Sequence, residues 1–341
     1  MDFFKDRKEV IILTPPGFSM ETHIVELRKD PLTGFVCRIN SNRSKRPMQV
    51  QPASSISDFT TTSSECPFCP EKIDTATPRF PSHIISSGYY QSGQVRLFPN
   101  LYPLAEYHAV ITLSREHFIP LERFRSEAIA DGISAAINFL SSLSTLSPSV
   151  IYPVLIWNHL PPSAASIVHP HMQLLVDTRP TWYQEQILNA GMEYYSKNKS
   201  CYWDDLIGHE RSSGERFVAE NDSLCIIASY APQGNREFQI ISKSVSSMVD
   251  MDKKQVNDLA VAVSTILKVY HKSGVESFNM TTMSSGVGVE SEFYRLNVKL
   301  IARPAARHIY RNDTGVLERV HFETDLEIEP ETLAQHAREY F

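Results

Sequence analysis

Two segments of the chain carry apolar residues at the spacing of an amphipathic helix. In the first, residues 128 to 143, Ile129, Ile133 and Ile137 recur at every fourth position, and residues 253 to 271 show a similar pattern. This spacing places the apolar side chains on one face of a helix. We therefore expect two helices, each with one face packed against a core.

Short apolar runs surround each of these helical segments. The first half contains VRLF, AVITL, YPVLIW and HMQLLV, and the second contains SLCIIAS, FQIISK, SFNMTT and RLNVKLIARP. Runs of this length and aliphatic content are typical of buried strands. The order strand, strand, helix, strand, strand thus occurs twice, and the two last strands align without a gap up to Pro180 and Pro304. An internal duplication, with its boundary between about residues 181 and 216, explains this repeat.

The last strand of the first copy, in SIVHPHMQLL, has polar residues at alternate positions. Successive side chains of a strand point to opposite faces, so His169, His171 and Gln173 would share one face. The second copy has Phe293, Arg295 and Asn297 at the aligned positions. Packing alone also explains two histidines in a strand, but their presence in a single copy favours one active half.

Asn158 and Ser166 precede this strand and add hydrogen-bonding groups without a carboxylate. Such a set suits an anion such as phosphate. A neutral imidazole is a competent nucleophile near pH 7 because its ordinary pKa is about 6.5. Attack on phosphorus would give a phosphoramidate, whose nitrogen leaves when a second acceptor arrives. The site could therefore transfer a nucleotidyl group in two half-steps.

Two of the five cysteines form the motif CPFC, Cys66 and Cys69, while the others are scattered. A closed structural zinc site needs four ligands, so two must come from elsewhere. The candidates in the same half are His108, His117 and His169. A redox pair is the alternative, but it is expected at a strand-to-helix junction, whereas this pair follows a Ser/Thr/Pro-rich loop.

Composition narrows the class of protein. The chain has 341 residues, with 33 Lys and Arg against 39 Asp and Glu. A net charge of -6 argues against a general nucleic-acid surface but allows a local phosphate pocket. We see no apolar run near the roughly 20 residues of a membrane helix and no signal-peptide cleavage site. We therefore expect a cytoplasmic protein.

A series of motifs, taken in order, resembles the galactose-1-phosphate uridylyltransferase branch of the histidine-triad superfamily. They are LRKDPLTGFVCRINSNRSKRP, CPFC, VRLFPNLYPL, EYHAVIT, LSREHFIPL and HPHMQ. The resemblance implies an α+β fold of two tandem histidine-triad-like units, with antiparallel sheets and packed helices in a half-barrel. The expected parts are a catalytic unit at 1–180, a connecting segment at 181–215 and a degenerate unit at 216–341.

The resemblance also implies roles for single residues in catalysis. His171 matches the nucleophile that becomes nucleotidylated, and Gln173 matches the glutamine that holds the phosphoryl oxygens. Ser166 and Asn158 match residues that contact the phosphates and orient the site. The remaining two zinc ligands are implied to be His117 and His169, beside Cys66 and Cys69.

Further residues are candidates for binding the substrate. Arg43, Arg46 and Asn100 match positions around the nucleotide's phosphates and ribose. Arg303 and Arg311 belong to a basic cluster near the end of the second copy. Arginines bind phosphates well by charge-assisted hydrogen bonds, but a solvated basic turn has the same composition.

The resemblance implies a nucleotidyltransferase that works by a ping-pong mechanism through nucleotidyl-His171. It would pass a nucleoside monophosphate between a nucleoside diphosphate sugar, or a related anhydride, and a phosphate or sugar phosphate. The pair Asn100-Leu101 also occurs in relatives that are adenylyl-transferring phosphorylases, so a phosphorylase or hydrolase of ADP-sugars or dinucleotides is the alternative. A non-catalytic nucleotide binder is a second alternative. One structural zinc ion and a homodimer are also implied.

Overall fold

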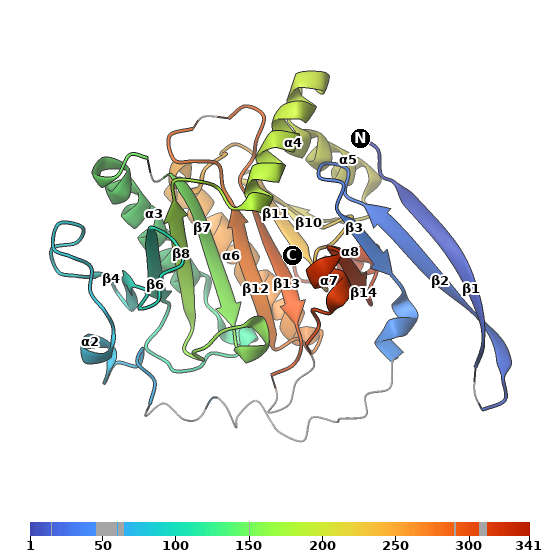
Figure 1. The fold of residues 1–341 in the computed structure, drawn as a ribbon, viewed down its shortest axis with the longest axis horizontal. Coiled ribbons are helices and arrows are strands. Elements are labelled where there is room, and N and C mark those ends of the chain that lie inside the picture. The colour runs from blue at the N-terminus through green and yellow to red at the C-terminus, as the bar shows by residue number, and fades with distance from the viewer. Residues whose placement is uncertain (15, 46–59, 61–64, 150, 290, 307–311) are drawn as a thin grey trace.

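A ten-stranded sheet forms the body of the protein (Figure 1). The computed structural model describes residues 1–14, 16–45, 60, 65–149, 151–289, 291–306 and 312–341. All neighbouring strands of this sheet are antiparallel. Their order across the sheet is β4 (Tyr90–Ser92), β5 (Val95–Pro99), β6 (Tyr107–Thr112), β8 (His171–Asp177), β7 (Tyr152–His159), β12 (Ser277–Met283), β13 (Asn297–Arg303), β11 (Phe238–Ser242), β10 (Leu224–Ala228) and β9 (Phe217–Glu220).

The strand order of the first half recurs in the second. Read from each outer edge, the first half runs β4, β5, β6, β8, β7 and the second runs β9, β10, β11, β13, β12. The two halves meet where β7 pairs with β12. The predicted α+β fold with antiparallel sheets is confirmed, and the repeated order agrees with a duplication. The boundaries 1–180, 181–215 and 216–341 stay a prediction.

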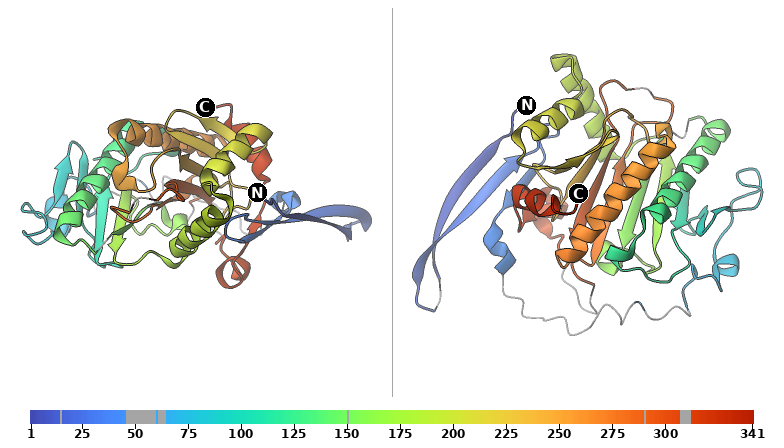
Figure 2. Two further views of the ribbon diagram at one scale, coloured as in Figure 1. Left: turned by 90° about the horizontal axis from the view of Figure 1, so that it is seen from above. Right: turned by 180° about the vertical axis from the view of Figure 1, so that it is seen from behind.

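Helices α3 (Ser126–Leu146) and α6 (Lys253–Lys272) lie side by side on one face of this sheet (Figure 2, right). Both predicted helices are therefore confirmed, and their apolar faces form the main core with the strands. Helix α6 begins with a capping box in which the Asp252 side chain and the Gln255 side chain bond each other's backbone N–H. Such a box satisfies amide groups that the first helical turn leaves without partners.

Helix α3 differs from one expectation. By length and composition it is apolar enough to cross a membrane, with half of its most apolar 18-residue window buried inside the protein. We expected no segment of this kind, because no uninterrupted apolar run comes near the length of a membrane helix. Small residues such as Ala130, Ala135 and Ala136 nevertheless raise the mean hydropathy of α3, and all three lie in the main core.

Helices α4 (Trp182–Asn198) and α5 (Tyr202–Ser213) lie on the opposite face, over the second half of the sheet. Cys225, Ile227 and Ile241 alternate with residues of the main core and pack against these helices, together with the fully buried Trp203. The corresponding face of the first half carries β8 and β7, where the candidate site lies. The two halves therefore differ in what covers this face.

A second sheet of four strands lies beside the body. Its order is β1 (Lys5–Thr14), β2 (Ser19–Lys29), β3 (Val36–Ile39) and β14 (Glu323–Leu326), with β14 parallel to β3. Strands β1 and β2 form a long hairpin that projects from the body (Figure 1). The short helical elements are η1 (Ser41–Lys45), α2 (Ile73–Ala76), η2 (Leu121–Arg123), η3 (Pro161–Ser163), η4 (Met248–Asp250), α7 (Val316–Val320) and α8 (Pro330–Ala337).

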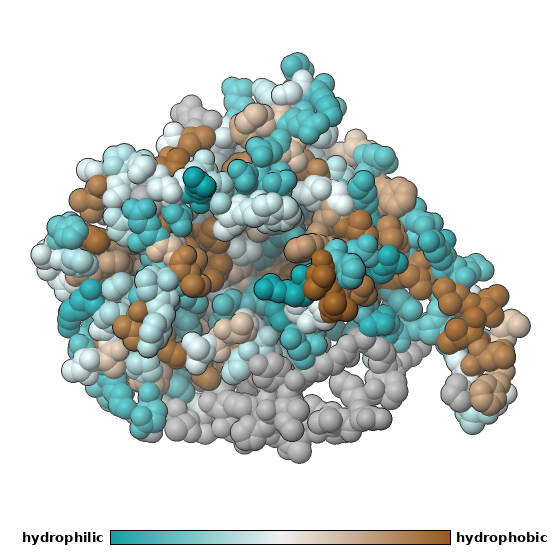
Figure 3. Space-filling model, in the orientation of Figure 1, coloured by the Kyte–Doolittle hydropathy of each residue, from teal (hydrophilic) through white to brown (hydrophobic). Residues whose placement is uncertain are grey.

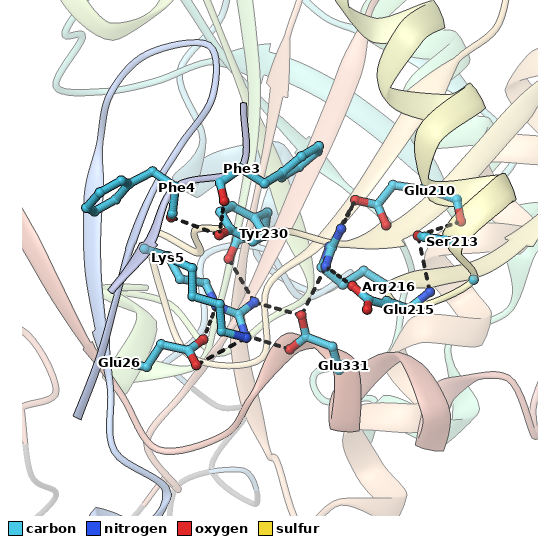
Figure 4. A network of polar contacts seen from close by, with 12 residues as sticks. Phe3, Phe4, Lys5, Glu26, Glu210, Ser213, Glu215, Arg216, Tyr230 and Glu331 are labelled. Atoms are coloured by element: carbon cyan, nitrogen blue, oxygen red, sulfur yellow. Dashed lines mark hydrogen bonds and ion pairs between the residues drawn. The ribbon is translucent and has the colours of Figure 1, made fainter. Parts of the chain in front are cut away.

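A buried ion network ties the base of the hairpin to the body (Figure 4). Arg28 of β2 is 1% exposed and makes two parallel 2.8 Å hydrogen bonds to the Glu331 carboxylate of α8. It also donates to Glu26 at 2.5 Å. Bidentate arginine–carboxylate pairs combine charge with fixed geometry. Arg28 therefore joins the hairpin to the C-terminal helix.

Arg216 provides the other half of this network. It donates to Glu331 at 3.1 Å and to the fully buried Glu210 of α5 at 2.8 and 2.9 Å. The guanidinium groups of Arg28 and Arg216 each lie 5.0 Å from the centre of the Tyr230 ring. Such cation–π contacts add to the ion pairs when the groups are desolvated. Glu331 is thus the carboxylate shared by both arginines.

We expect this network to make stability depend on pH in the acidic range. Burial alone would raise the pKa of Glu331, but hydrogen bonds from Arg28 and Arg216 lower it to about 2. Since the folded pKa lies below the ordinary value, the stabilisation is complete above about pH 4.5 and is lost as the pH falls toward 2. Glu331→Gln should lower the free energy of unfolding at pH 7 by on the order of 2 kcal/mol.

Denaturant melts between pH 2 and 7 measure this effect. The pH dependence should be smaller in Glu331→Gln than in the wild type. Glu339→Gln, at an exposed position on the same C-terminal segment, is the matched control and should leave the pH profile unchanged. A Glu331→Gln profile parallel to that of the wild type would contradict the assignment.

Candidate functional site

Strand β8 presents His171 and Gln173 on the face of the sheet away from α3 and α6. The intervening Met172 and the following Leu174 are fully buried in the main core. The predicted alternation is therefore confirmed for these residues. The strand begins at His171, so His169 lies just before it rather than within it.

The ring of His171 is held by the backbone of a neighbouring residue. Its Nδ1 lies 2.7 Å from the His169 carbonyl oxygen, which can only accept, so Nδ1 carries the proton. The other ring nitrogen, Nε2, is left with its lone pair and has no hydrogen-bond partner among the described residues. Burial lowers the pKa of His171, although the bond to the His169 carbonyl opposes this, and the ring is only 6% exposed. His171 is thus a neutral imidazole of defined tautomer near pH 7.

Gln173 is oriented by a chain of three hydrogen bonds. The Leu104 N–H donates to His108 Nδ1 at 3.1 Å, which places the proton of that imidazole on Nε2. His108 Nε2 then donates to Gln173 Oε1 at 2.9 Å, and Asn100 Nδ2 donates to the same oxygen at 3.1 Å. The carboxamide oxygen is therefore occupied. The NH₂ group of Gln173 has no protein partner among the residues that the structure describes and can donate to a ligand.

His108 does not lie among the four grouped cysteines and histidines. It was a candidate metal ligand, but the structure sets it against Gln173, with burial lowering its pKa. It lies on β6, which pairs with β8 so that His108 is opposite Leu175. The sequence alone could not predict the hydrogen bond between His108 and Gln173, because it depends on the pairing of β6 with β8.

A second set of polar side chains crosses the centre of the sheet. Asn279 of β12 stands directly opposite Asn158 of β7 and donates to its Oδ1 at 2.6 Å. Asn279 Oδ1 in turn accepts from Arg303 Nη1 at 2.9 Å, and Arg303 Nη2 donates to Asp313 at 2.6 Å. The structure thus joins the predicted Asn158 to the predicted Arg303, through an asparagine that sequence reasoning missed.

Ser166 and Arg43 are two further predicted site residues that the structure describes. Ser166 is exposed in the loop before β8. Arg43 pairs with Asp325 of β14. Arg46 and Arg311 lie outside the described residues. A cavity of about 590 Å³ has η1 residues Ser41 and Ser44 in its lining, as well as Arg303.

Two cysteines and two histidines converge next to His171. The ligand atoms of Cys66, Cys69, His117 and His169 all lie within 4.8 Å of one another. Cys69 Sγ is 3.4 Å from His117 Nδ1 and 3.6 Å from His169 Nδ1. These are the four residues predicted as metal ligands. The structure therefore brings together a set that could hold a metal ion.

The chemistry of the four donors fits a closed tetrahedral site. His169 Nε2 donates to the Ser114 carbonyl at 2.9 Å, which leaves the Nδ1 lone pair facing the cysteines. Burial raises the pKa of the Cys69 thiol to about 12, and the nearby Cys66 adds to the effect. A divalent cation would reverse this effect, because it stabilises the thiolate form. Two thiolates and two imidazoles are a common ligand set for zinc.

Phe68, between the two cysteines, connects this cluster to His171. Its ring centroid lies 5.3 Å from that of His171 and 6.2 Å from that of His169, edge to face in both cases. It also contacts Phe98 of β5 at 5.3 Å. The CPFC loop thus packs against both histidines of the HPH motif.

No protein-family model matches the chain. An uncharacterised protein of Archaeoglobus fulgidus is 29% identical over 341 residues, which is 99% of this chain and 98% of the relative. The galactose-1-phosphate uridylyltransferase of Schizosaccharomyces pombe is 30% identical over 104 residues, 30% of this chain and 28% of that enzyme. Among solved structures, an ADP-glucose phosphorylase from Arabidopsis thaliana with bound ADP-glucose has a TM-score of 0.72 at 20% identity, covering 92% of this chain and 98% of its own.

A solved uridylyltransferase has a TM-score of 0.68 at 18% identity and covers 92% of this chain and 98% of its own. The chain has the galactose-1-phosphate uridylyltransferase-like fold. The resemblance found in the sequence is thus confirmed at the level of the fold. Within this uridylyltransferase-like fold, His171 and Gln173 lie on β8, and the four candidate metal ligands lie near its start.

We expect the purified protein to contain about one metal ion per chain. Cys69→Ser removes a thiolate donor and should lose most of the bound metal, as measured by elemental mass spectrometry on protein prepared without chelators. His83→Ala, at an exposed position of the same half, should keep the ion. Retention of a full equivalent in a folded Cys69→Ser protein would exclude this cluster as the site.

Proposed function

We propose that the protein is a nucleotidyltransferase that uses His171 as its nucleophile. The observation that carries this proposal is the fixed tautomer of His171, whose Nδ1–H is bound by the His169 carbonyl while Nε2 has a lone pair. Nε2 attacks the α-phosphorus of a nucleoside diphosphate sugar, a P–N bond forms, and the P–O bond to the sugar 1-phosphate breaks. The leaving group departs with that electron pair.

The second half-reaction reverses the first with a new acceptor. A phosphate oxygen of the acceptor attacks the phosphorus of nucleotidyl-His171, the P–N bond breaks, and its electrons return to the imidazole. The His169 carbonyl accepts the hydrogen bond of Nδ1–H throughout and favours the cationic ring of the intermediate. The NH₂ group of Gln173 donates to the phosphoryl oxygens, which carry more negative charge in the transition state.

The remaining predicted residues are assigned to binding. Ser166 and Asn158 contact the phosphates and orient the site. Arg303 and Arg43 bind anionic parts of the substrates, and Arg46 and Arg311 are proposed for the same role. Asn100 contacts the nucleotide and also holds Gln173.

We propose zinc as the metal at Cys66, Cys69, His117 and His169. The ion would hold the CPFC loop and the start of β8 together, and it is structural. The four donors and the bond from His169 to the Ser114 carbonyl support this choice. We also propose a homodimer in the cytoplasm.

A phosphorylase or hydrolase is the second candidate function. It keeps the same first half-step and changes the acceptor to inorganic phosphate or water. The similarity in fold to an ADP-glucose phosphorylase supports it. Products formed from UDP- or ADP-sugars, with either phosphate or hexose phosphate as the acceptor, separate the two functions.

We expect a covalent adduct when the protein is incubated with the correct nucleotide donor. Intact-mass spectrometry should show one nucleoside monophosphate per chain in the wild type and none in His171→Ala. His336→Ala, at an exposed position, is the control and should form the adduct. An adduct of unchanged yield in His171→Ala would overturn the choice of nucleophile.

We expect His108→Ala to slow adduct formation by about 10- to 100-fold, because the imidazole that donates to Gln173 Oε1 is removed and the Gln173 amide can turn. His108→Gln places an amide donor at a similar reach and should recover part of the rate. Single-turnover measurements follow the chemical step, while metal content and melting temperature report on structure. Equal rates for the wild type and His108→Ala would show that this hydrogen bond does not position Gln173.

A further inference from the structure

The outer part of the β1–β2 hairpin exposes apolar side chains on both faces. Seven large apolar residues of this hairpin are 40–72% exposed: Val10, Ile11, Ile12, Leu13, Phe18, Met20 and Ile24. Figure 3 shows a hydrophobic patch at the far end of the hairpin. We call this outer part the arm. Contiguous exposed apolar surface of this kind marks an interaction site.

The two faces of the arm follow from its register. Ile11 stands opposite Thr22 and Leu13 opposite Met20, while Val10 and Ile12 alternate with them and point to the other side. A two-stranded hairpin alone is only marginally stable in water. The base of the hairpin is held by the Arg28 and Glu331 ion pair, but the arm extends beyond it. A partner that covers the arm would therefore stabilise it.

Strand β1 also forms the outer edge of the four-stranded sheet. It pairs with β2 on one side, and on the other side no strand of the described chain pairs with it. All of β1 except Asp6 and Thr14 is exposed. An edge strand has a row of backbone N–H and C=O groups ready to pair with another chain. The arm thus offers hydrogen bonds as well as apolar surface.

The charges of β1 are complementary to those of a second copy. We propose that β1 pairs edge to edge and antiparallel with β1 of a second copy of this chain, about a twofold axis at Arg7. This register places Lys5 opposite Glu9 of the second copy and Asp6 opposite Lys8 of the second copy. Opposite charges at facing positions stabilise a strand pair, and the twofold axis repeats each pair.

Arg7 and the apolar residues fit the same register. On the axis the two Arg7 side chains face each other, and each already pairs with Glu26 of its own chain at 2.5 Å. Val10 stands opposite Phe4 of the second copy, which is 47% exposed in the single chain. Residues 11 to 13 then face residues 3 to 1 of the second copy, where Phe3 packs against His209 and Tyr230 of its own chain. The pairing joins two four-stranded sheets into one continuous sheet, and it does not depend on the chemistry proposed for His171.

Charge reversal tests the pairing directly. Lys8→Asp sets two carboxylates against each other at two symmetric places, so we expect dissociation constants at least 10-fold higher in sedimentation equilibrium. The swap Asp6→Lys with Lys8→Asp restores opposite charges across the axis and preserves the pair within the chain. It should recover the dimer. Loss of the dimer in Lys8→Asp without recovery in the swap would overturn the register, and a monomeric wild type would overturn the interface.

Single cysteines then locate the twofold axis. All five native cysteines are buried, so they give little background when mild oxidant or a short bis-maleimide is added. Arg7→Cys should form a covalent dimer in high yield, and Ile11→Cys should not, because Ile11 lies away from the axis. Cross-linking of Ile11→Cys but not of Arg7→Cys would mean that the arms pair tip to tip. No cross-link at either position in a dimeric protein would assign the dimer to another surface. Both results contradict the proposal.

Discussion

The pairing of β7 with β12 at the middle of the large sheet is the contact on which the rest of the fold depends. Four residue pairs join the strands, from His159 and Phe278 to Ile156 and Thr281. On one face this pairing brings the rings of Trp157 and Phe278 to 5.0 Å inside the core. Without it, each half would end in an uncovered strand edge.

The same pairing determines the composition of the candidate site. On the open face it aligns Asn158 with Asn279, and through Asn279 it connects to Arg303. Residues from the second half thereby reach the neighbourhood of β8, although that half lacks the histidines. Helices α4 and α5 cover the open face of the second half. The candidate site residues His171 and Gln173 therefore lie on the half that α4 and α5 do not cover.

Sequence patterns predicted the elements and the local motifs well. The helices at Ser126–Leu146 and Lys253–Lys272 follow from apolar spacing, because each has one face against the core. The set of four candidate metal ligands followed from a resemblance, and the structure groups all four residues. The partners of Gln173 and Asn158 could not be predicted, since His108 and Asn279 are 65 and 121 residues away from them and strand pairing alone brings them close. Arg43 was expected near the phosphates, yet its contact with Asp325 depends on the parallel pairing of β14 with β3.

His169 interacts with two neighbours through two different parts, its side chain and its backbone. Its imidazole is one of the four candidate metal ligands, while its backbone carbonyl accepts the hydrogen bond of His171 Nδ1–H. Pro170 stands between the two histidines and restricts the backbone there. The position of the four candidate metal ligands is therefore coupled to the His171 ring through a single restricted dipeptide. A shift of these four ligands would change the orientation of the His171 imidazole. An ion bound there would therefore control the geometry at His171 without taking part in the reaction.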